Sequence, residues 1–271
     1  MAARKRFGQH FLEPAWVVKV IDAIRPEPGD EFVEIGPGRA ALTTPLAATA
    51  KRVVAFEIDR DLAAALRSAA PANVTVVEGD FLQSDWLTTH PFPHPIRVAG
   101  NLPYNVASPI LFKLIELYDH GVPMTDATLM LQREVVDRLV ATPATKEYGV
   151  LTVLVRLSAD VTRLLTLPPG AFRPAPKVQS GLVRLRFHPP SPSPANRAQF
   201  ASMVTAIFTR RRKTIENALL AYIRADRPTI AATLERAGID GRRRPETLDV
   251  PEFVRLSDAL PRLTAASQRT S

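Results

Sequence analysis

Short runs of apolar and β-branched residues recur through the first two thirds of the chain, and helix-like polar stretches separate them. Such runs predict β-strands over residues 32–35, 52–57, 73–77, 96–100 and 127–131. Helices are expected to begin near Ala40 and after Asp59, whose side chain can cap a helix N-terminus. Regular alternation of strand and helix is typical of a parallel sheet with helices on both faces. The pattern therefore predicts an α/β fold.

Two further strand-like runs, 161–167 and 178–187, are joined by a proline-rich loop rather than by a helix. A loop this short favours antiparallel pairing, since a parallel connection needs a crossover of about a dozen residues or more. We expect this pair to close one edge of the sheet, which makes the sheet mixed but mainly parallel.

The clearest boundary is the stretch 188–194, where four prolines fall within seven residues. Proline cannot continue a helix or a central strand, and it favours a stiff, extended linker. Amphipathic patterns that predict helices follow at 197–224, 228–238 and 251–260. We therefore expect a first domain over 1–189 and a small, basic, all-α domain over 190–271.

The composition excludes several classes of protein. Hydrophobic residues make up 46% of the 271 positions, which is enough for a core, and there is no cysteine. The absence of cysteine excludes disulfides, thiolate metal sites and cysteine nucleophiles, and it suits a reducing compartment. The basic start, 1–7, lacks the apolar stretch of a signal peptide, and no apolar run reaches the ~20 residues of a membrane span. We expect a soluble, cytoplasmic protein with no membrane contact.

The net charge of +8 is unevenly distributed. Residues 190–271 hold 14 Lys and Arg against 8 Asp and Glu, whereas 1–189 hold 21 against 19. A localised positive surface attracts polyanions such as nucleic acids. The runs 210–213 and 242–244 are candidate phosphate contacts, although a solvated, charged helix end explains each residue equally well.

A glycine loop follows the first predicted strand, where Gly36, Gly38 and Ala41 complete the pattern G-x-G-x-x-[GA]. Glycines let the backbone approach a ligand where a side chain would block it. Glu57 comes 21 positions after Gly36, at the end of the second strand, where an acid can accept hydrogen bonds from ribose hydroxyls. Enzymes that use nicotinamide dinucleotides and enzymes that use S-adenosylmethionine would both employ this pair.

Residues at the ends of the next two strands favour S-adenosylmethionine over a nicotinamide dinucleotide as the ligand. Asp80 can accept a hydrogen bond from an adenine amino group, and Asn101-Leu102-Pro103-Tyr104 is the signature of enzymes that methylate an amine conjugated to a ring or carbonyl. The lone pair of such an amine is delocalised, so two acceptors, the Asn101 side-chain oxygen and a carbonyl near Leu102, can make it more nucleophilic. Pro103 stiffens the loop, and Tyr104 offers a face for an extruded base.

With these motifs the chain resembles the KsgA/RsmA family of ribosomal RNA small subunit adenine N6,N6-dimethyltransferases, which is related to the Dim and Erm enzymes. The matching stretches span nearly the whole chain in order, at 4–12, 34–38, 101–104, 171–180 and 211–217. The resemblance implies a Rossmann-like S-adenosylmethionine-dependent methyltransferase domain over 1–189. Residues 190–271 would then be a small all-α domain that contacts ribosomal RNA.

The resemblance also implies individual roles. Cofactor contacts fall on His10, Leu12, Gly36, Glu57, Asp80 and Asn101. The catalytic set is Asn101, Leu102, Pro103, Tyr104 and Phe172, with Phe172 stacking on the face of the base opposite Tyr104. Many family members carry Asn where this chain has His10, and we assign His10 no catalytic role. No metal is implied.

The implied reaction is dimethylation of N6 on two adjacent adenosines near the 3′ end of small-subunit ribosomal RNA. S-adenosylmethionine is the implied cofactor, the partner is an immature small ribosomal subunit, and the protein is a monomer. The alternatives are a macrolide-resistance methylase acting on large-subunit RNA, and a ribosome-assembly or transcription factor without turnover. A nicotinamide-dependent oxidoreductase is weakest, because the motif at 101–104 would have no purpose there.

Overall fold

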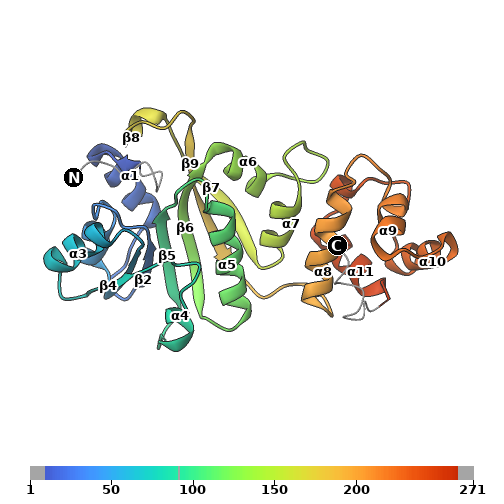
Figure 1. The fold of residues 1–271 in the computed structure, drawn as a ribbon, viewed down its shortest axis with the longest axis horizontal. Coiled ribbons are helices and arrows are strands. Elements are labelled where there is room, and N and C mark those ends of the chain that lie inside the picture. The colour runs from blue at the N-terminus through green and yellow to red at the C-terminus, as the bar shows by residue number, and fades with distance from the viewer. Residues whose placement is uncertain (1–9, 91, 262–271) are drawn as a thin grey trace. The chain divides into compact units, whose positions relative to one another are not determined.

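Seven strands form one sheet in the computed structural model, which describes residues 10–90 and 92–261. They stand in the order β4-β3-β2-β5-β6-β9-β7 (Figure 1). The strands are β2 (Glu31–Ile35), β3 (Arg52–Glu57), β4 (Val74–Glu78), β5 (Ile96–Asn101), β6 (Met124–Gln132), β7 (Ala159–Leu167) and β9 (Ser180–Phe187). The pairs from β4 to β6 are parallel, whereas β9 lies antiparallel between β6 and β7. The expected mixed, mainly parallel sheet with an antiparallel pair at one edge is confirmed.

The central strand β2 is buried along its whole length, as expected for a parallel strand covered on both faces. Its end packs closely against β5, because a Cβ atom on Gly100 would lie 2.7 Å from the carbonyl oxygen of Ile35. Only glycine fits there without a backbone shift. This close approach brings the carboxyl ends of β2 and β5 together, and the glycine loop and the 101–104 motif begin at those two ends.

Helices connect these strands. They are α1 (Pro14–Ile24), α2 (Thr43–Thr49), α3 (Arg60–Ala69), α4 (Trp86–Thr89), α5 (Ala107–Asp119) and α6 (Arg133–Val140). The expected cap is confirmed, since the Asp59 side chain accepts hydrogen bonds from the backbone N–H groups of Asp61 and Leu62. The helix expected near Ala40 begins three residues later, at Thr43, because Ala40 has a φ of 62° and prolongs the turn.

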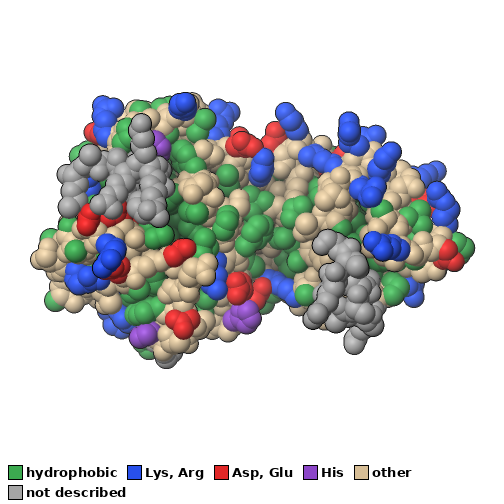
Figure 2. Space-filling view, in the orientation of Figure 1, with side chains coloured by type: hydrophobic (Ala, Val, Ile, Leu, Met, Phe, Trp, Pro, Cys, Tyr) green, Lys and Arg blue, Asp and Glu red, His purple; other side chains and the backbone are tan. Residues whose placement is uncertain are grey.

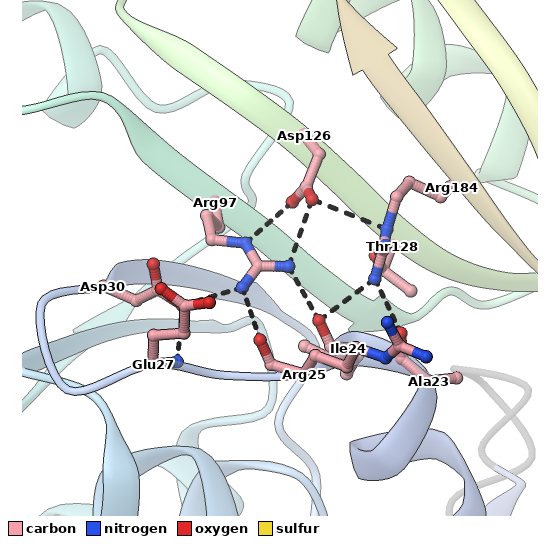
Figure 3. Close-up of polar contacts among 9 residues, drawn as sticks. All are labelled: Ala23, Ile24, Arg25, Glu27, Asp30, Arg97, Asp126, Thr128 and Arg184. Carbon is pink, nitrogen blue, oxygen red and sulfur yellow. Dashed lines mark hydrogen bonds and ion pairs between the residues drawn. The ribbon is translucent and has the colours of Figure 1, made fainter.

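A buried ionic cluster holds the end of α1 against the sheet (Figure 3). Arg97 donates to both carboxylate oxygens of Asp126 at 3.1 Å, and to Asp30 at 2.7 Å. Arg97 and Arg184 also donate to the carbonyl of Ile24, the last residue of α1, at 2.7 and 3.0 Å. The last carbonyls of a helix lack partners within it, so cations there both cap the helix and complement its dipole.

A second, two-stranded sheet precedes α1. It pairs β1 (Phe11–Leu12) antiparallel with β8 (Phe172–Arg173), so that Leu12 lies opposite Phe172. The backbone N–H of Glu13 extends this pairing with a 2.9 Å hydrogen bond to the carbonyl of Ala171, which belongs to the short 3₁₀ turn η2 (Pro169–Ala171). Residues far apart in sequence, near positions 11 and 172, are thereby held side by side.

The remaining helices form an all-α unit, as expected. They are α7 (Val150–Arg156), α8 (Arg197–Phe208), α9 (Ile215–Ile223), α10 (Arg227–Ala237), the 3₁₀ turn η3 (Pro245–Thr247) and α11 (Val250–Ala259). The single helix expected over 197–224 is two helices, because the chain leaves the helix after Phe208 and the side chain of Thr214 caps α9. No helix among residues 10–90 and 92–261 is long and apolar enough to cross a membrane.

The chain divides into two units, and the division differs from the expected 1–189 and 190–271 in one segment. Unit 1 comprises Met1–Asp137 and Ala159–Phe187, and unit 2 comprises Arg138–Ser158 and His188–Ser271. The division between Phe187 and His188 falls at the start of the proline-rich stretch. The segment 138–158 joins unit 2 because Tyr148 and Val153 are buried in that unit's core.

Candidate active site

A pocket opens in unit 1 at the carboxyl ends of strands β2 to β5. This edge is where ligands bind in open α/β sheets. The structure brings nearly all the predicted site residues to its wall: His10, Leu12, Gly36, Glu57, Asp80, Asn101, Leu102, Pro103 and Tyr104. Phe172 is the exception.

The glycine loop and Glu57 form one hydrogen-bonded unit. Gly36 and Gly38 have φ of 71° and 56°, in the left-handed region that favours glycine. One carboxylate oxygen of Glu57 accepts from the N–H of Gly38 at 2.9 Å, and the other accepts from the N–H of Asp59 at 2.9 Å. Burial raises the pKa of Glu57. Each oxygen retains acceptor capacity toward the pocket, so the residue can both hold the loop and bind a hydroxyl.

Asp80 is fixed in the turn after β4. One of its carboxylate oxygens accepts a hydrogen bond from the N–H of Leu82 at 3.0 Å. Beside it, Phe81 packs edge-on against Phe56 with ring centroids 5.3 Å apart, and both rings line the pocket. An acceptor beside an apolar wall suits a flat heterocycle that carries an amino group.

Asn101 ends β5 with its amide group oriented by one contact. Its Nδ2 donates to the carbonyl of His10 at 2.8 Å. Because Nδ2 is engaged in this hydrogen bond, the amide orientation is fixed, and the remaining polar atom is Oδ1, which can only accept a hydrogen bond. The next residue is held as well, since the N–H of Leu102 donates to the carbonyl of Met130 at 3.2 Å. The arrangement offers an acceptor, as a target amine requires.

Tyr104 is fixed at its hydroxyl and covered on its ring. Its hydroxyl lies 2.8 Å from the hydroxyl of Ser180, and its ring stacks with that of His10 at a centroid distance of 5.6 Å and an angle of 27°. The His10 Nδ1 lies 2.7 Å from the carbonyl oxygen of Pro174. Burial raises the pKa of Tyr104, so the phenol stays protonated at neutral pH. His10 thus contacts both Asn101 and Tyr104, which its position in the sequence did not reveal.

Phe172 lies elsewhere than expected. Its side chain is 1% exposed and belongs to the core cluster that includes Leu12, Leu167 and Leu182. Pairing of β8 with β1 holds it there, and it is not among the residues lining the pocket. The structure gives Phe172 a packing role, and its stacking on the target base stays a prediction.

Glu34 is not among the site residues predicted from the sequence, although this acid stands just before the glycine loop. Glu34 is 1% exposed and lines the pocket, and its Oε2 finds no hydrogen-bond partner among the described residues. Burial raises its pKa to about 7. A buried acceptor with spare capacity fits a ligand that brings N–H groups or positive charge. An acid in a buried strand was the signal that could have identified it.

Comparison with known proteins decides the family. The model of the ribosomal RNA adenine dimethylase family matches residues 1–260. The chain belongs to this family. Among curated members, the ribosomal RNA small subunit methyltransferase A of Acinetobacter baylyi is 44% identical over 262 residues, covering 95% of this chain and 92% of that protein. The methyltransferase of the same name from Aromatoleum aromaticum is 44% identical over 260 residues, covering 94% and 93%.

Solved structures agree with the family assignment. A dimethyladenosine transferase from Plasmodium falciparum superposes with a TM-score of 0.76 at 26% identity, covering 91% of this chain and 96% of its own. The 23S rRNA methyltransferase ErmE superposes with a TM-score of 0.67 at 28% identity, covering 92% and 99%. The Rossmann-like methyltransferase fold expected from the sequence is thereby confirmed.

The basic runs 210–213 and 242–244 of this family member contain three kinds of side chain. Arg211 donates to the carbonyls of Thr145 and Lys146 at 2.8 and 2.6 Å, and Arg243 donates to Glu252 at 2.5 Å, so both hold the unit together. Arg242 pairs with Asp240 at the surface. Within these two runs, the side chains that form no hydrogen bond or ion pair with the described part of the chain are those of Arg210, Arg212, Lys213 and Arg244.

Three of the unpaired basic residues, Arg212, Lys213 and Arg244, lie on two neighbouring segments. The segments that carry them run side by side, because the N–H of Ile215 donates to the carbonyl of Arg243 at 2.8 Å and that of Glu216 donates to the carbonyl of Gly241 at 3.1 Å. Figure 2 shows Lys and Arg side chains gathered over this helical unit. We call Arg212, Lys213 and Arg244, all exposed, the basic surface of unit 2.

Proposed function

We propose that this protein uses S-adenosylmethionine to dimethylate N6 of two adjacent adenosines near the 3′ end of small-subunit ribosomal RNA, within an immature small ribosomal subunit. The observation that carries the proposal is that Asn101 and Tyr104 line the same pocket as the glycine loop and Glu57. The full-length similarity to relatives named ribosomal RNA small subunit methyltransferase A supports the choice of RNA.

The pocket residues fit the cofactor group by group. Glu57 would hold the ribose hydroxyls, and Asp80 would accept from the adenine amino group. Glu34, whose Oε2 has no hydrogen-bond partner among the described residues, suits the ammonium of the amino-acid portion beside Gly36. His10 and Leu12 line the same pocket. When bound, S-adenosylmethionine supplies a methyl group on a positively charged sulfur, which is already an activated electrophile.

The chain's own contribution is alignment and exclusion of water. Asn101 Oδ1 accepts an N–H of the target amine and turns its lone pair toward the methyl group, while the 101–104 loop holds the base. Tyr104 stacks on the extruded base, a contact worth roughly 1–3 kcal/mol per base in nucleic-acid binders. The loop contains no Asp or Glu, and none is required, because the methylated nitrogen becomes acidic and loses its proton to water.

Similarity to ErmE makes large-subunit RNA the second candidate substrate. Purified small and large ribosomal subunits, each incubated with the full-length protein and S-adenosylmethionine labelled on the methyl group, separate the two. We expect label in small subunits only, with mass spectrometry locating two dimethyladenosines. Label confined to large subunits would favour the second candidate, and absence of label from both would favour a factor without turnover.

A further inference from the structure

We infer that Ser180 is a positioning residue that fixes the ring plane of Tyr104 for stacking on the target base. The two hydroxyl oxygens are 2.8 Å apart. The inference rests on the proposed function, because Tyr104 touches a base only in that reaction. Ser180 does not line the pocket, so its effect on the substrate must pass through Tyr104.

Ser180 stands on a strand that is paired on both sides. It is the first residue of β9, and its Cα lies opposite Gln132 of β6 on one side and Leu167 of β7 on the other. The residue is 2% exposed. A strand paired on both sides cannot shift by itself, so the Ser180 hydroxyl is a fixed point at the sheet end.

Tyr104 lies on a less constrained segment. It follows Pro103 in the turn between β5 and α5, outside regular secondary structure. A tyrosine ring turns about two side-chain torsions, and a hydrogen bond at its far end removes most of that freedom. Stacking needs nearly parallel faces, so a ring held in one plane keeps the bound base aligned for the methyl transfer, and loss of that alignment lowers kcat.

The chemistry of Ser180 and Tyr104 suits a hydrogen bond that persists across the neutral pH range. Both groups are neutral hydroxyls that can each donate and accept, so either can supply the hydrogen. The raised pKa of Tyr104 keeps the phenol protonated through neutral pH, so its hydrogen bond with Ser180 does not depend on pH in that range. Removing one partner should cost about three- to tenfold in rate, the range of one net hydrogen bond.

The test is a double-mutant cycle in the full-length protein acting on purified small subunits. Ser180→Ala and Tyr104→Phe each remove the same hydrogen bond from opposite ends, and Tyr104→Phe retains the ring. We expect each variant to lower kcat about three- to tenfold, with little change in KM or in cofactor affinity. The double variant should lose no more than either single variant. Ser257→Ala is the matched control, a buried serine of unit 2 whose hydroxyl has no hydrogen-bond partner among the described residues.

A merely structural role for Ser180 predicts a different result. In that case Ser180→Ala would lower the Tm and leave kcat unchanged at temperatures below the Tm. Alternatively, the decrease in kcat of the double variant would equal the product of the decreases in the two single variants. Either outcome overturns the inference. If Ser180→Ala does not fold, an unchanged kcat of Tyr104→Phe overturns it equally. Failure of the wild-type protein to label small subunits would instead contradict the proposed function.

Discussion

At Asn101 a single amide group serves two neighbours, which makes it the most sensitive side chain of the site. Its Nδ2 is bonded to the carbonyl of His10, and its Oδ1 is the acceptor proposed for the target amine. We expect Asn101→Ala to reduce methyl incorporation by roughly 10²–10³-fold, as for other preorganised hydrogen-bonding groups. Cofactor affinity, measured by calorimetry, should fall far less than the rate, because Asn101 is one of several predicted cofactor contacts, and Tm should change little. Near-normal turnover of the purified variant would refute the assignment.

Phe172 gives a residue-scale prediction that separates packing from base stacking. Because its ring is 1% exposed in the core, Phe172→Ala should lower the free energy of unfolding by about 3–5 kcal/mol, measured in urea. Phe112→Ala, on a helix residue that is 38% exposed, is the control and should cost far less. If Phe172→Ala keeps its stability and weakens RNA binding, the ring stacks on the base after all.

The pKa of Glu34 predicts how stability depends on pH. The folded state raises this pKa from 4.5 to about 7, so folding favours the protonated acid. The stabilisation is complete below pH 4.5 and is lost as the pH rises through 7. Glu34→Gln mimics the protonated form and should flatten the fall in unfolding free energy across this window, an effect on the order of 3 kcal/mol. An identical pH profile for both proteins would contradict this.

At the scale of elements, the ionic cluster determines where α1 and the preceding β1 are held. Asp126→Asn would leave Arg97 and Arg184 partly uncompensated in a site where Arg97 is only 11% exposed. We expect a loss of about 3 kcal/mol in the free energy of unfolding, since breaking a buried pair leaves a charge without its partner. Glu116→Gln, which removes a surface pair with Lys113, should change it by less than about 1 kcal/mol.

The elements predicted correctly from sequence are those with local signals. The Asp59 cap and the apolar run 52–57 determine their elements from neighbouring residues alone. The helix over 197–224 was predicted without its break, because the polar residues 209–214 that separate α8 from α9 are mostly Arg and Lys, which are themselves good helix formers. Likewise, only tertiary packing assigns 138–158 to unit 2.

In the site, too, the sequence predicts what local motifs determine and misses what tertiary packing determines. Motif spacing identified Gly36, Glu57 and Asn101, whose strands meet because parallel strands share one carboxyl edge. The contacts of Tyr104 with His10 and Ser180 span long sequence separations and follow from the pairing of β1 and β9 with distant strands. Burial of Phe172 likewise depends on β8 pairing, and no sequence motif records it.

At the scale of the whole molecule, the net charge of +8 becomes informative only once the structural arginines are set aside. Arg211 and Arg243 bind carbonyl and carboxylate oxygens of unit 2, so replacing them would damage the unit before it tested RNA binding. The basic surface of unit 2 has no such contacts with the described residues. It is therefore one part of the charge that is available to phosphates.

Neutralising that surface gives a prediction with a clear physical signature. Each phosphate contact contributes about 0.7–0.9 to the slope of log affinity against log salt concentration. Replacing Arg212, Lys213 and Arg244 together by Gln should lower small-subunit affinity and reduce the slope by about 2–3, with Tm unchanged. The control variant replaces Arg60 and Arg67, exposed residues of unit 1, by Gln and should leave the slope nearly unaltered. Added salt weakens phosphate contacts but has little effect on base stacking. An unchanged slope in the triple variant would therefore assign the phosphate contacts to other residues, even if the methylation rate of that variant also changed.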